Sequence, residues 1–204
     1  MATITDDHIA SVSLKDSKSN PQAFADKLGR SFEVYGFAII ADHGIPAELI
    51  HRAEEMAKAF FALPEDVKRK YLVPGGGGAR GYTPFGIETA KGAKAHDLKE
   101  FWHVGRELPE GHRFSDHMPG NLWPSEVPSF KDTFQELYAR FDRTGLEILK
   151  AIARHLKIGE DYFEDAVRDG NSVLRALHYP PQEEPTGEHI RAGAHEDINA
   201  ITLL

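Results

Sequence analysis

This chain contains no cysteine, which excludes disulfide bonds, thiolate metal ligands and cysteine nucleophiles. It is also poor in positive charge: 24 Lys and Arg against 32 Asp and Glu give a formal net charge of -8. That balance argues against a nucleic-acid or anionic-membrane partner. No apolar run reaches the length of a membrane span, and residues 1–20 lack the apolar core of a signal peptide. These absences predict a cytoplasmic globular protein, and 204 residues are enough to bury a core.

Helical patterns dominate the first part of the sequence. Asn20 followed by Pro21 predicts a helix start, apolar residues then recur at helical spacing, and Gly36 predicts the helix end. Two further helices are expected between residues 46 and 71, and a long amphipathic helix over residues 129–156. Most of the predicted helices therefore precede the last strands of the chain.

Apolar runs and alternation predict short strands at residues 9–14, 37–40, 101–104, 173–179 and 193–204. Helices followed by strands predict an α+β protein whose C-terminal part is an antiparallel sheet or barrel. The last strand ends in the apolar run 201–204, which needs neighbouring strands to cover it. The four glycines at 75–78 predict a flexible loop, because the sequence around them lacks the lysine and helix of a phosphate cradle.

A histidine and an aspartate in the last predicted strand form a candidate metal site. His195 is the only one of the 11 histidines with a carboxylate two positions on, at Asp197. Strand residues two apart face the same side, so an imidazole and a carboxylate converge on one point. One further imidazole would complete the 2-His-1-carboxylate triad of non-haem Fe(II) oxygenases. The alternative is an ordinary polar pair on a half-exposed strand.

Seven motifs occur in order along nearly the whole chain: YGFAIIADHGI at 35–45, FFALPEDVK at 60–68, RGY at 80–82, DLKE at 97–100, NLWP at 121–124, LRALHYPP at 174–181, and GAHED at 193–197 with TLL at 202–204. With these motifs the chain resembles the isopenicillin N synthase-like branch of the Fe(II)/2-oxoglutarate-dependent dioxygenases. The resemblance implies an N-terminal helical region packed on a double-stranded β-helix, or jelly-roll, core that is incomplete in this chain. Residues 1–125 would form the N-terminal dioxygenase region, and residues 126–204 the long helix and first strands of a truncated jelly-roll domain.

The resemblance also implies an oxidoreductase that uses Fe(II), molecular oxygen and 2-oxoglutarate to oxidise a small organic substrate, with release of succinate and CO2. His195 and Asp197 would be iron ligands. The family's third iron ligand, a distal His, and its Arg-x-Ser motif for the far carboxylate of 2-oxoglutarate are expected beyond Leu204, so activity would need residues that follow. The identity of the substrate is not readable, because variable loops select it. Neither the reaction outcome nor the oligomeric state can be read from these residues.

Four further residues are candidate contacts of the cosubstrate or substrate. Tyr179 and Arg175 are predicted to share a strand face and to bind 2-oxoglutarate. The alternative for Tyr179 is a side chain that packs in the barrel wall. The alternative for Arg175 is a buried side chain in a structural ion pair. Leu204 is expected to line the cosubstrate pocket or to pack in the core. Glu88 is a candidate substrate contact, or else a solvated loop carboxylate.

The remaining histidines are expected to be turn, surface or structural residues. His43 follows a strand and is expected in a turn, His178 should point away from the face of Tyr179, and His103 is expected to be structural or exposed.

Two other functions of the protein stay open. Leu177 stands where the family commonly has Asn, which leaves open an oxidase of the same branch that uses no 2-oxo acid. A truncated, non-catalytic binding module is the alternative outside the enzymes.

Overall fold

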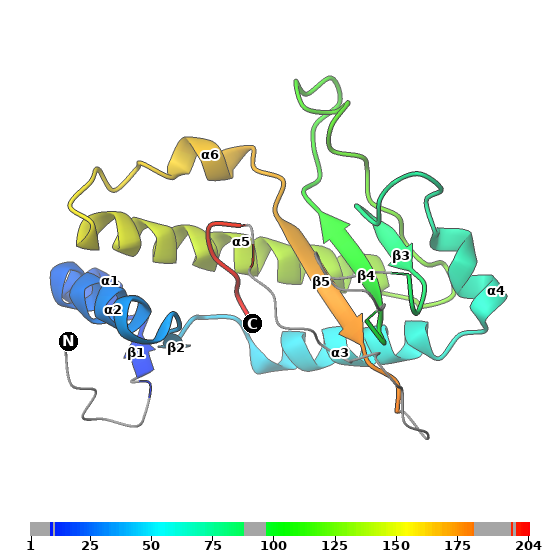
Figure 1. Cartoon of the computed structure of the whole chain (residues 1–204), viewed down its shortest axis with the longest axis horizontal. Helices are drawn as coiled ribbons and strands as arrows, with labels where there is room; N and C mark the ends of the chain where they lie inside the picture. The colour runs from blue at the N-terminus through cyan, green and yellow to red at the C-terminus, as the bar shows by residue number, and fades with distance from the viewer. Residues whose placement is uncertain (1–8, 10, 88–96, 182–196, 198) are drawn as a thin grey trace. The chain divides into compact units, whose positions relative to one another are not determined.

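The computed structural model describes residues 9, 11–87, 97–181, 197 and 199–204. The chain divides into two compact units, Met1–Pro46 with Arg140–Gly170 and Ala47–Ala139 with Asn171–Leu204. The long helix α5, Phe130–His155, contributes to both units (Figure 1). Among the helices that the structure describes, none combines the length and the apolar character needed to cross a membrane.

The first unit combines short strands with helices: β1 Ser11–Ser13, α1 Asp16–Ser19, α2 Pro21–Tyr35, β2 Ile39–Ala41, the C-terminal part of α5, and α6 Glu164–Arg168. Strands β1 and β2 pair in parallel, with Val12 opposite Ile40. Both strands were expected from the sequence, at residues 9–14 and 37–40, and each observed strand is shorter than the segment predicted for it.

Helix α2 has the two ends that its sequence predicts. The Asn20 side chain accepts a hydrogen bond from the Ala23 amide at 3.3 Å, and Pro21 occupies the first turn. Gly36 ends the helix in the left-handed conformation with a φ of 71°. The apolar face buries Phe24 and Leu28. Local capping chemistry and helical periodicity therefore account for this element.

Gly29 lets the end of α5 approach the middle of α2. A Cβ atom at Gly29 would lie 2.1 Å from the His155 ring, far inside van der Waals contact. His155 is held there by Glu33, 3.0 Å from Nε2, and by Asp26, 3.6 Å from Nδ1. The bond to Glu33 outweighs the effect of burial, and together with Asp26 it raises the pKa of His155. The ring therefore has little freedom to move aside.

We expect Gly29→Ala to destabilise the protein by about 1–3 kcal/mol, since overpacking a held ring forces backbone or rotamer shifts. Urea unfolding followed by circular dichroism measures the change. Gly159→Ala is the matched control, because a Cβ there meets nothing within 4 Å. Equal stability of the two variants would show that His155 gives way without cost.

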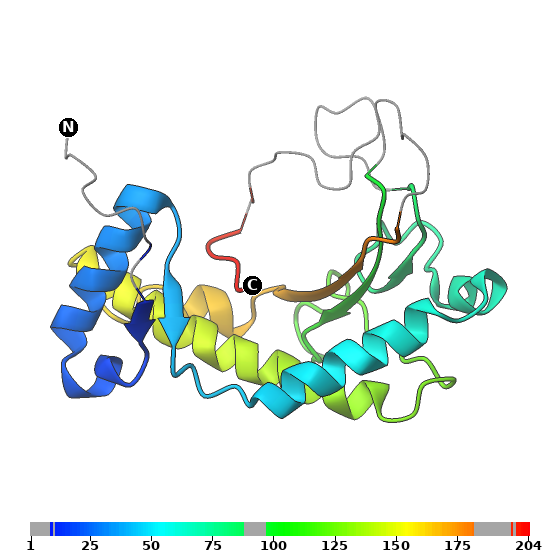
Figure 2. The ribbon, with the colours of Figure 1, turned by 90° about the horizontal axis from the view of Figure 1, so that it is seen from below.

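The second unit contains the larger sheet and the helices that cover it: α3 Ala47–Phe61, α4 Glu65–Lys68 with the 3-10 turn Arg69–Tyr71, β3 Gly81–Thr83, β4 Glu100–Gly105, the first turns of α5, and β5 Val173–His178. The strand order is β3-β4-β5, and both pairings are antiparallel. Figure 2 shows α3 and the first turns of α5 side by side against one face of this sheet. The sheet is antiparallel, as expected, but it was predicted for the C-terminal part of the chain, and β3 and β4 precede α5 whereas β5 follows it.

Trp102 lies at the centre of the aromatic core between sheet and helices. Its ring centroid is 4.6 Å from that of Phe60 on α3 and 5.2 Å from that of Phe130 on α5. Trp102, Phe60 and Phe130 are all almost fully buried. Edge-to-face aromatic pairs of this kind add to the free energy of burying their apolar surface. This core fixes β4 against the helices and therefore positions both faces of the sheet.

The strand expected at residues 193–204 is not found in its described part. Residues 197 and 199–204 form no strand there. Local side-chain bonds hold the segment instead: the Thr202 hydroxyl donates to Asp197 at 2.5 Å and also accepts from Asn199 at 3.0 Å. An apolar strand needs a pairing partner, and none of the described strands pairs with this segment.

Candidate functional site

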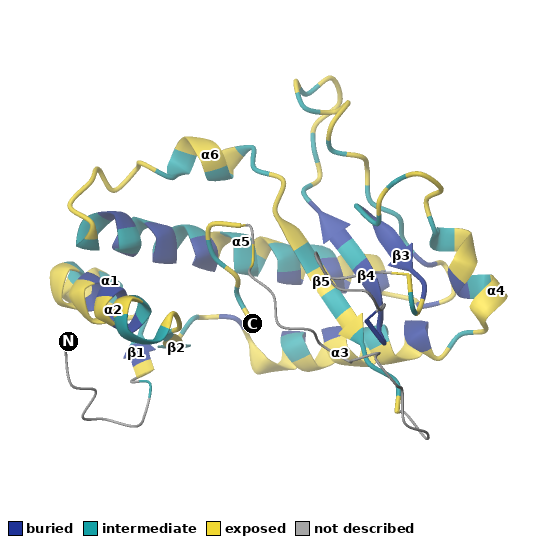
Figure 3. Cartoon of the chain, viewed as in Figure 1, coloured by how far each residue is buried: buried dark blue, intermediate teal, exposed yellow. Residues whose placement is uncertain are grey.

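The pairing of β4 with β5 sorts the polar residues of this region onto two faces. Glu100 lies opposite His178, and His103 lies opposite Arg175. Because side chains alternate along a strand, the first pair faces the core side of Trp102 and the second pair faces the other side. Figure 3 shows β4 mostly buried, whereas β5 alternates between exposed and half-buried residues. The second face is therefore the more open one.

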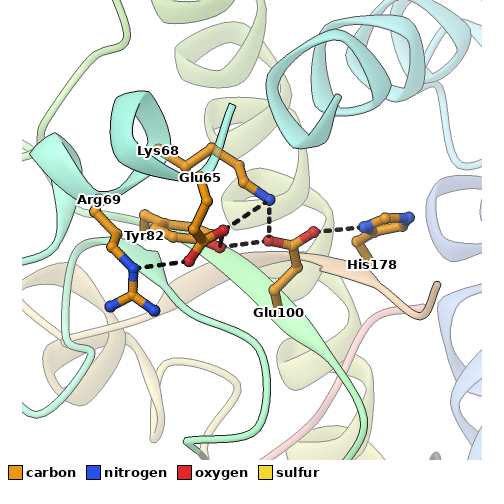
Figure 4. A network of polar contacts seen from close by, with 6 residues as sticks. All are labelled: Glu65, Lys68, Arg69, Tyr82, Glu100 and His178. Carbon is orange, nitrogen blue, oxygen red and sulfur yellow. Dashed lines mark hydrogen bonds and ion pairs between the residues drawn. The ribbon is translucent and has the colours of Figure 1, made fainter. Parts of the chain in front are cut away.

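On the core face, the Glu100 carboxylate is the centre of a buried polar network (Figure 4). One oxygen accepts from Lys68 Nζ at 2.7 Å and from the Tyr82 hydroxyl at 2.5 Å. The other oxygen is 2.7 Å from Nδ1 of His178. Glu65 extends the network, since it also accepts from Tyr82 at 3.2 Å and pairs with Arg69 at 2.9 Å. Four elements, α4, β3, β4 and β5, thus meet at one carboxylate.

The network keeps Glu100 ionised in spite of its burial. Burial opposes the charge, but the hydrogen bonds from Lys68, Tyr82 and His178 outweigh it and hold the pKa of Glu100 below its usual value. Burial and the bond to Glu100 raise the pKa of Tyr82, so its hydroxyl stays protonated and donates. Because an ionised carboxylate only accepts, Nδ1 of His178 carries a proton.

The same network anchors the end of β5. His178 is the last residue of that strand, and its ring stacks on Phe61 with 5.1 Å between centroids. Its orientation toward Glu100 confirms that it points away from the face of Arg175, as the alternation of the strand predicts. The residue that follows is Tyr179, which is half-buried. Glu100 therefore fixes the backbone immediately before a candidate ligand-binding residue.

On the open face, Arg175 is exposed, which corrects the expectation of a buried arginine. Its Nε donates a hydrogen bond to Nε2 of His103 at 2.7 Å. The guanidinium carbon lies 4.2 Å from the ring centroid of Phe101, which is itself 3% exposed. This face is thus open to solvent at the middle of β5, whereas Phe101 on β4 and Thr83 on β3, which share the face, are buried.

The other predicted site residues are either exposed or lie outside the described residues. Asp197 is exposed and accepts the Thr202 hydrogen bond on Oδ2. Leu204 is fully exposed and does not pack in the described core. His195 and Glu88 lie outside the described residues. Arg175 thus lies in β5, whereas Tyr179 comes directly after the end of that strand. Their shared role and the contacts of the metal pair stay predictions.

No cluster of metal-binding side chains forms in the described part of the chain. Within residues 9, 11–87, 97–181, 197 and 199–204, no three His, Asp or Glu side chains gather in a way that could hold a metal ion. His43 is a turn residue, as expected, since its Nδ1 accepts from the Ile45 amide at 3.2 Å. Asp197 offers an exposed carboxylate, a hard oxygen donor that suits Fe(II). Its hydrogen bond from Thr202 uses one position on one oxygen, so the donor chemistry fits a metal ligand.

The sequence did not predict the contacts of Glu100 on the core face or the contact of His103 with Arg175 on the open face. Lys68, Tyr82 and Glu100 lie in motifs of the chain, but their mutual contacts were not predicted. A signal existed, because Glu100 lies two positions from Trp102 and therefore faces the core, where a carboxylate needs a cation. His103 gave no such signal, since only the register of β4 with β5 places it opposite Arg175.

Comparison with known protein families gives a match over more than half of the chain. Residues 9–126 match the family model described as the non-haem dioxygenase in morphine synthesis N-terminal region. Among curated relatives, the proline hydroxylase buaE of Petromyces alliaceus is 31% identical over 94% of this chain and 60% of its own length. The 2-oxoglutarate-Fe(II) type oxidoreductase hxnY of Emericella nidulans is 32% identical over 85% of this chain and 52% of its own length. The chain therefore spans about half to three fifths of these relatives.

Solved structures give the same picture. A 2-oxoglutarate-Fe(II) oxygenase family protein from Caulobacter crescentus is similar with a TM-score of 0.83 and 52% identity, over 94% of this chain and 61% of that one. A structure of JOX2 in complex with 2OG, Fe and JA is similar with a TM-score of 0.63 and 25% identity, over 84% of this chain and 48% of that one. The arrangement of helices and sheet described above is thus shared with oxygenases of this type.

Proposed function

Because the chain belongs to the non-haem, 2-oxoglutarate–Fe(II) dioxygenase family, we propose that the protein carrying it oxidises a small organic substrate with molecular oxygen. One oxygen atom would go to the substrate and the other to 2-oxoglutarate, which would leave as succinate and CO2. The observation that supports this most strongly is the family match over residues 9–126, followed on the same chain by the His-Glu-Asp segment at 195–197. The incomplete jelly-roll core, the division at residues 125 and 126, and a cytoplasmic location belong to the same proposal.

In this proposal His195 and Asp197 hold Fe(II), and the family's distal His supplies the third ligand. When bound, Fe(II) supplies a Lewis acid with open positions for the cosubstrate and for oxygen. The contribution of this chain is the carboxylate of Asp197, whose Oδ2 is fixed by the Thr202 hydroxyl at 2.5 Å. A hydrogen bond of this kind orients a carboxylate ligand and tunes its affinity for the metal.

Arg175 and Tyr179 would bind 2-oxoglutarate from the open face of β5. An arginine can donate two parallel hydrogen bonds to a carboxylate, and a tyrosine hydroxyl can donate one. The exposed guanidinium stacked on Phe101 is suited to this role, because the ring holds it without using its donors. Leu204 would line the cosubstrate pocket and Glu88 would contact the substrate.

The direct test is to supply the full-length protein with Fe(II), oxygen and 2-oxoglutarate and to measure succinate. Formation of succinate, stimulated by candidate small substrates, supports the proposal. Oxygen consumption without succinate would support the oxidase alternative, which Leu177 in place of the family's Asn leaves open. Neither product nor oxygen consumption would support a non-catalytic binding module.

For the cosubstrate residues we expect separate effects on the KM for 2-oxoglutarate. Tyr179→Phe removes one hydrogen bond and should raise KM about fivefold, for a loss of about 1 kcal/mol. Arg175→Met removes a charged partner and should raise KM about 30- to 140-fold, for about 2–3 kcal/mol. Tyr162→Phe and Arg168→Met are matched controls, because both side chains are exposed outside this sheet. Unchanged KM values in both test variants would assign Arg175 to a substrate contact or to structure.

A further inference from the structure

His103 and Arg175 meet side by side across two strands of the open sheet face. They are register partners of β4 and β5, and Nε of Arg175 lies 2.7 Å from Nε2 of His103. On the other side of the same ring, Nδ1 of His103 lies 2.5 Å from the carbonyl oxygen of Gly78. The imidazole therefore bridges a backbone carbonyl and a guanidinium.

The chemistry of the two partners fixes the protonation of this ring. The Nε–H of an arginine can only donate, so Nε2 of His103 must offer its lone pair. A backbone carbonyl can only accept, so Nδ1 must carry the hydrogen. Both conditions hold in one state only, the neutral imidazole protonated at Nδ1. A charged imidazole would have no acceptor left for Arg175.

The glycine-rich loop places the carbonyl that selects this tautomer. Gly78 has a φ of 71°, a conformation that side chains rarely adopt. A Cβ atom there would also lie 2.9 Å from the Thr83 hydroxyl on β3. The loop therefore runs close to the sheet at this point, which gives residues 75–78 a structural reason other than phosphate binding.

Two contacts together hold the guanidinium of Arg175. Phe101 supports its flat face at 4.2 Å, and Phe101 is itself beside the His103 ring, with 4.6 Å between centroids. His103 accepts from Nε and so fixes the rotation of the group in its own plane. With Nε bonded to His103, the edge formed by the two terminal nitrogens is the one that this orientation offers for two parallel bonds to a carboxylate. Holding an arginine in advance in this way reduces the entropy lost when a carboxylate binds.

We propose that His103 is a positioning residue whose neutral imidazole, bonded to the Gly78 carbonyl, holds Arg175 in the orientation that binds a carboxylate of 2-oxoglutarate. This role rests on the proposed function and deepens it. His103 acts through Arg175 and does not itself touch the cosubstrate.

The test compares two His103 variants in the full-length protein by the KM for 2-oxoglutarate and by kcat. His103→Phe keeps a ring but removes the acceptor, and it should raise KM about tenfold while kcat stays within about twofold. His103→Gln restores an acceptor near Nε2 and should bring KM within about threefold of the wild-type value. His51→Phe is the control, because its side chain is 72% exposed on α3.

A readout independent of turnover checks the tautomer. Nitrogen-15 NMR of labelled His103 should show a protonated Nδ1 and a bare Nε2 near neutral pH, and Arg175→Met should shift the Nε2 signal. If the wild type forms succinate but His103→Phe leaves KM unchanged, the positioning role is overturned and the proposed function stands. A wild type that forms no succinate overturns the proposed function, and this role of His103 with it.

Discussion

The Asp197→Ala variant of the full-length protein should retain almost no Fe(II), and the His195→Ala variant should behave in the same way. In the proposed facial triad each substitution would remove one of three protein donors, and two donors would leave the metal to exchange with solvent. Elemental analysis after anaerobic loading and desalting measures the metal content directly, and the wild type should hold about one iron per chain. The expected loss of succinate formation would follow, but the metal content does not depend on it.

A carboxylate elsewhere on the surface serves as the control for this substitution. Asp161 is exposed at the loop before α6, and Asp161→Ala should leave the iron content unchanged. Full iron occupancy in both the Asp197 and the His195 variants would show that this pair is an ordinary polar pair of the terminal segment. The metal would then have to be held by other residues of the full-length protein.

Much of the fold could be predicted from the sequence because its signals are local. Asn20, Pro21 and Gly36 mark both ends of α2 through capping chemistry that needs no distant partner. The 26-residue helix α5 was predicted from apolar periodicity alone, with bounds one residue away at each end. The terminal segment after residue 196 shows the limit of such signals, since an apolar alternating run becomes a strand only where another strand pairs with it.

The candidate site was predictable only in part, because its geometry depends on register. Alternation along β5 correctly separated His178 from the face of Arg175. It could not reveal that Arg175 meets His103, since that contact joins residues 72 positions apart. The buried ion pair of Lys68 with Glu100 has the same origin, as it joins α4 to β4.

Replacing Glu100 by Gln should destabilise the second unit strongly. Glu100 and Lys68 have side chains only 6% and 9% exposed, with 2.7 Å between their charged atoms. Losing the buried carboxylate leaves Lys68 with the half-exposed Glu65, at 3.3 Å, as its anionic partner. Breaking a buried ion pair in this way typically costs about 3–5 kcal/mol. Urea unfolding followed by tryptophan fluorescence measures the loss, because Trp102 lies in the same core.

Two further variants separate the ion pair from simple loss of packing. Lys68→Met combined with Glu100→Gln should recover part of the lost stability, because the double variant no longer buries a lysine without its buried carboxylate partner. Lys58→Met is the surface control: Lys58 pairs with Glu55 at 2.8 Å but is 69% exposed, so its loss should cost no more than about 1 kcal/mol. If Glu100→Gln costs no more than Lys58→Met, the buried network does not stabilise the fold.

The pH dependence of stability gives an independent test of the same carboxylate. The folded-state pKa of Glu100 lies below the ordinary value of 4.5, so the folded protein binds this proton less readily than the unfolded chain. The resulting stabilisation is present above pH 4.5 and is lost as the pH falls through the lower folded-state pKa. Wild type and Glu100→Gln should therefore differ in unfolding free energy at neutral pH and converge in acid. A difference that stays constant down to the acid limit would mean that the charge of Glu100 is not what the network stabilises.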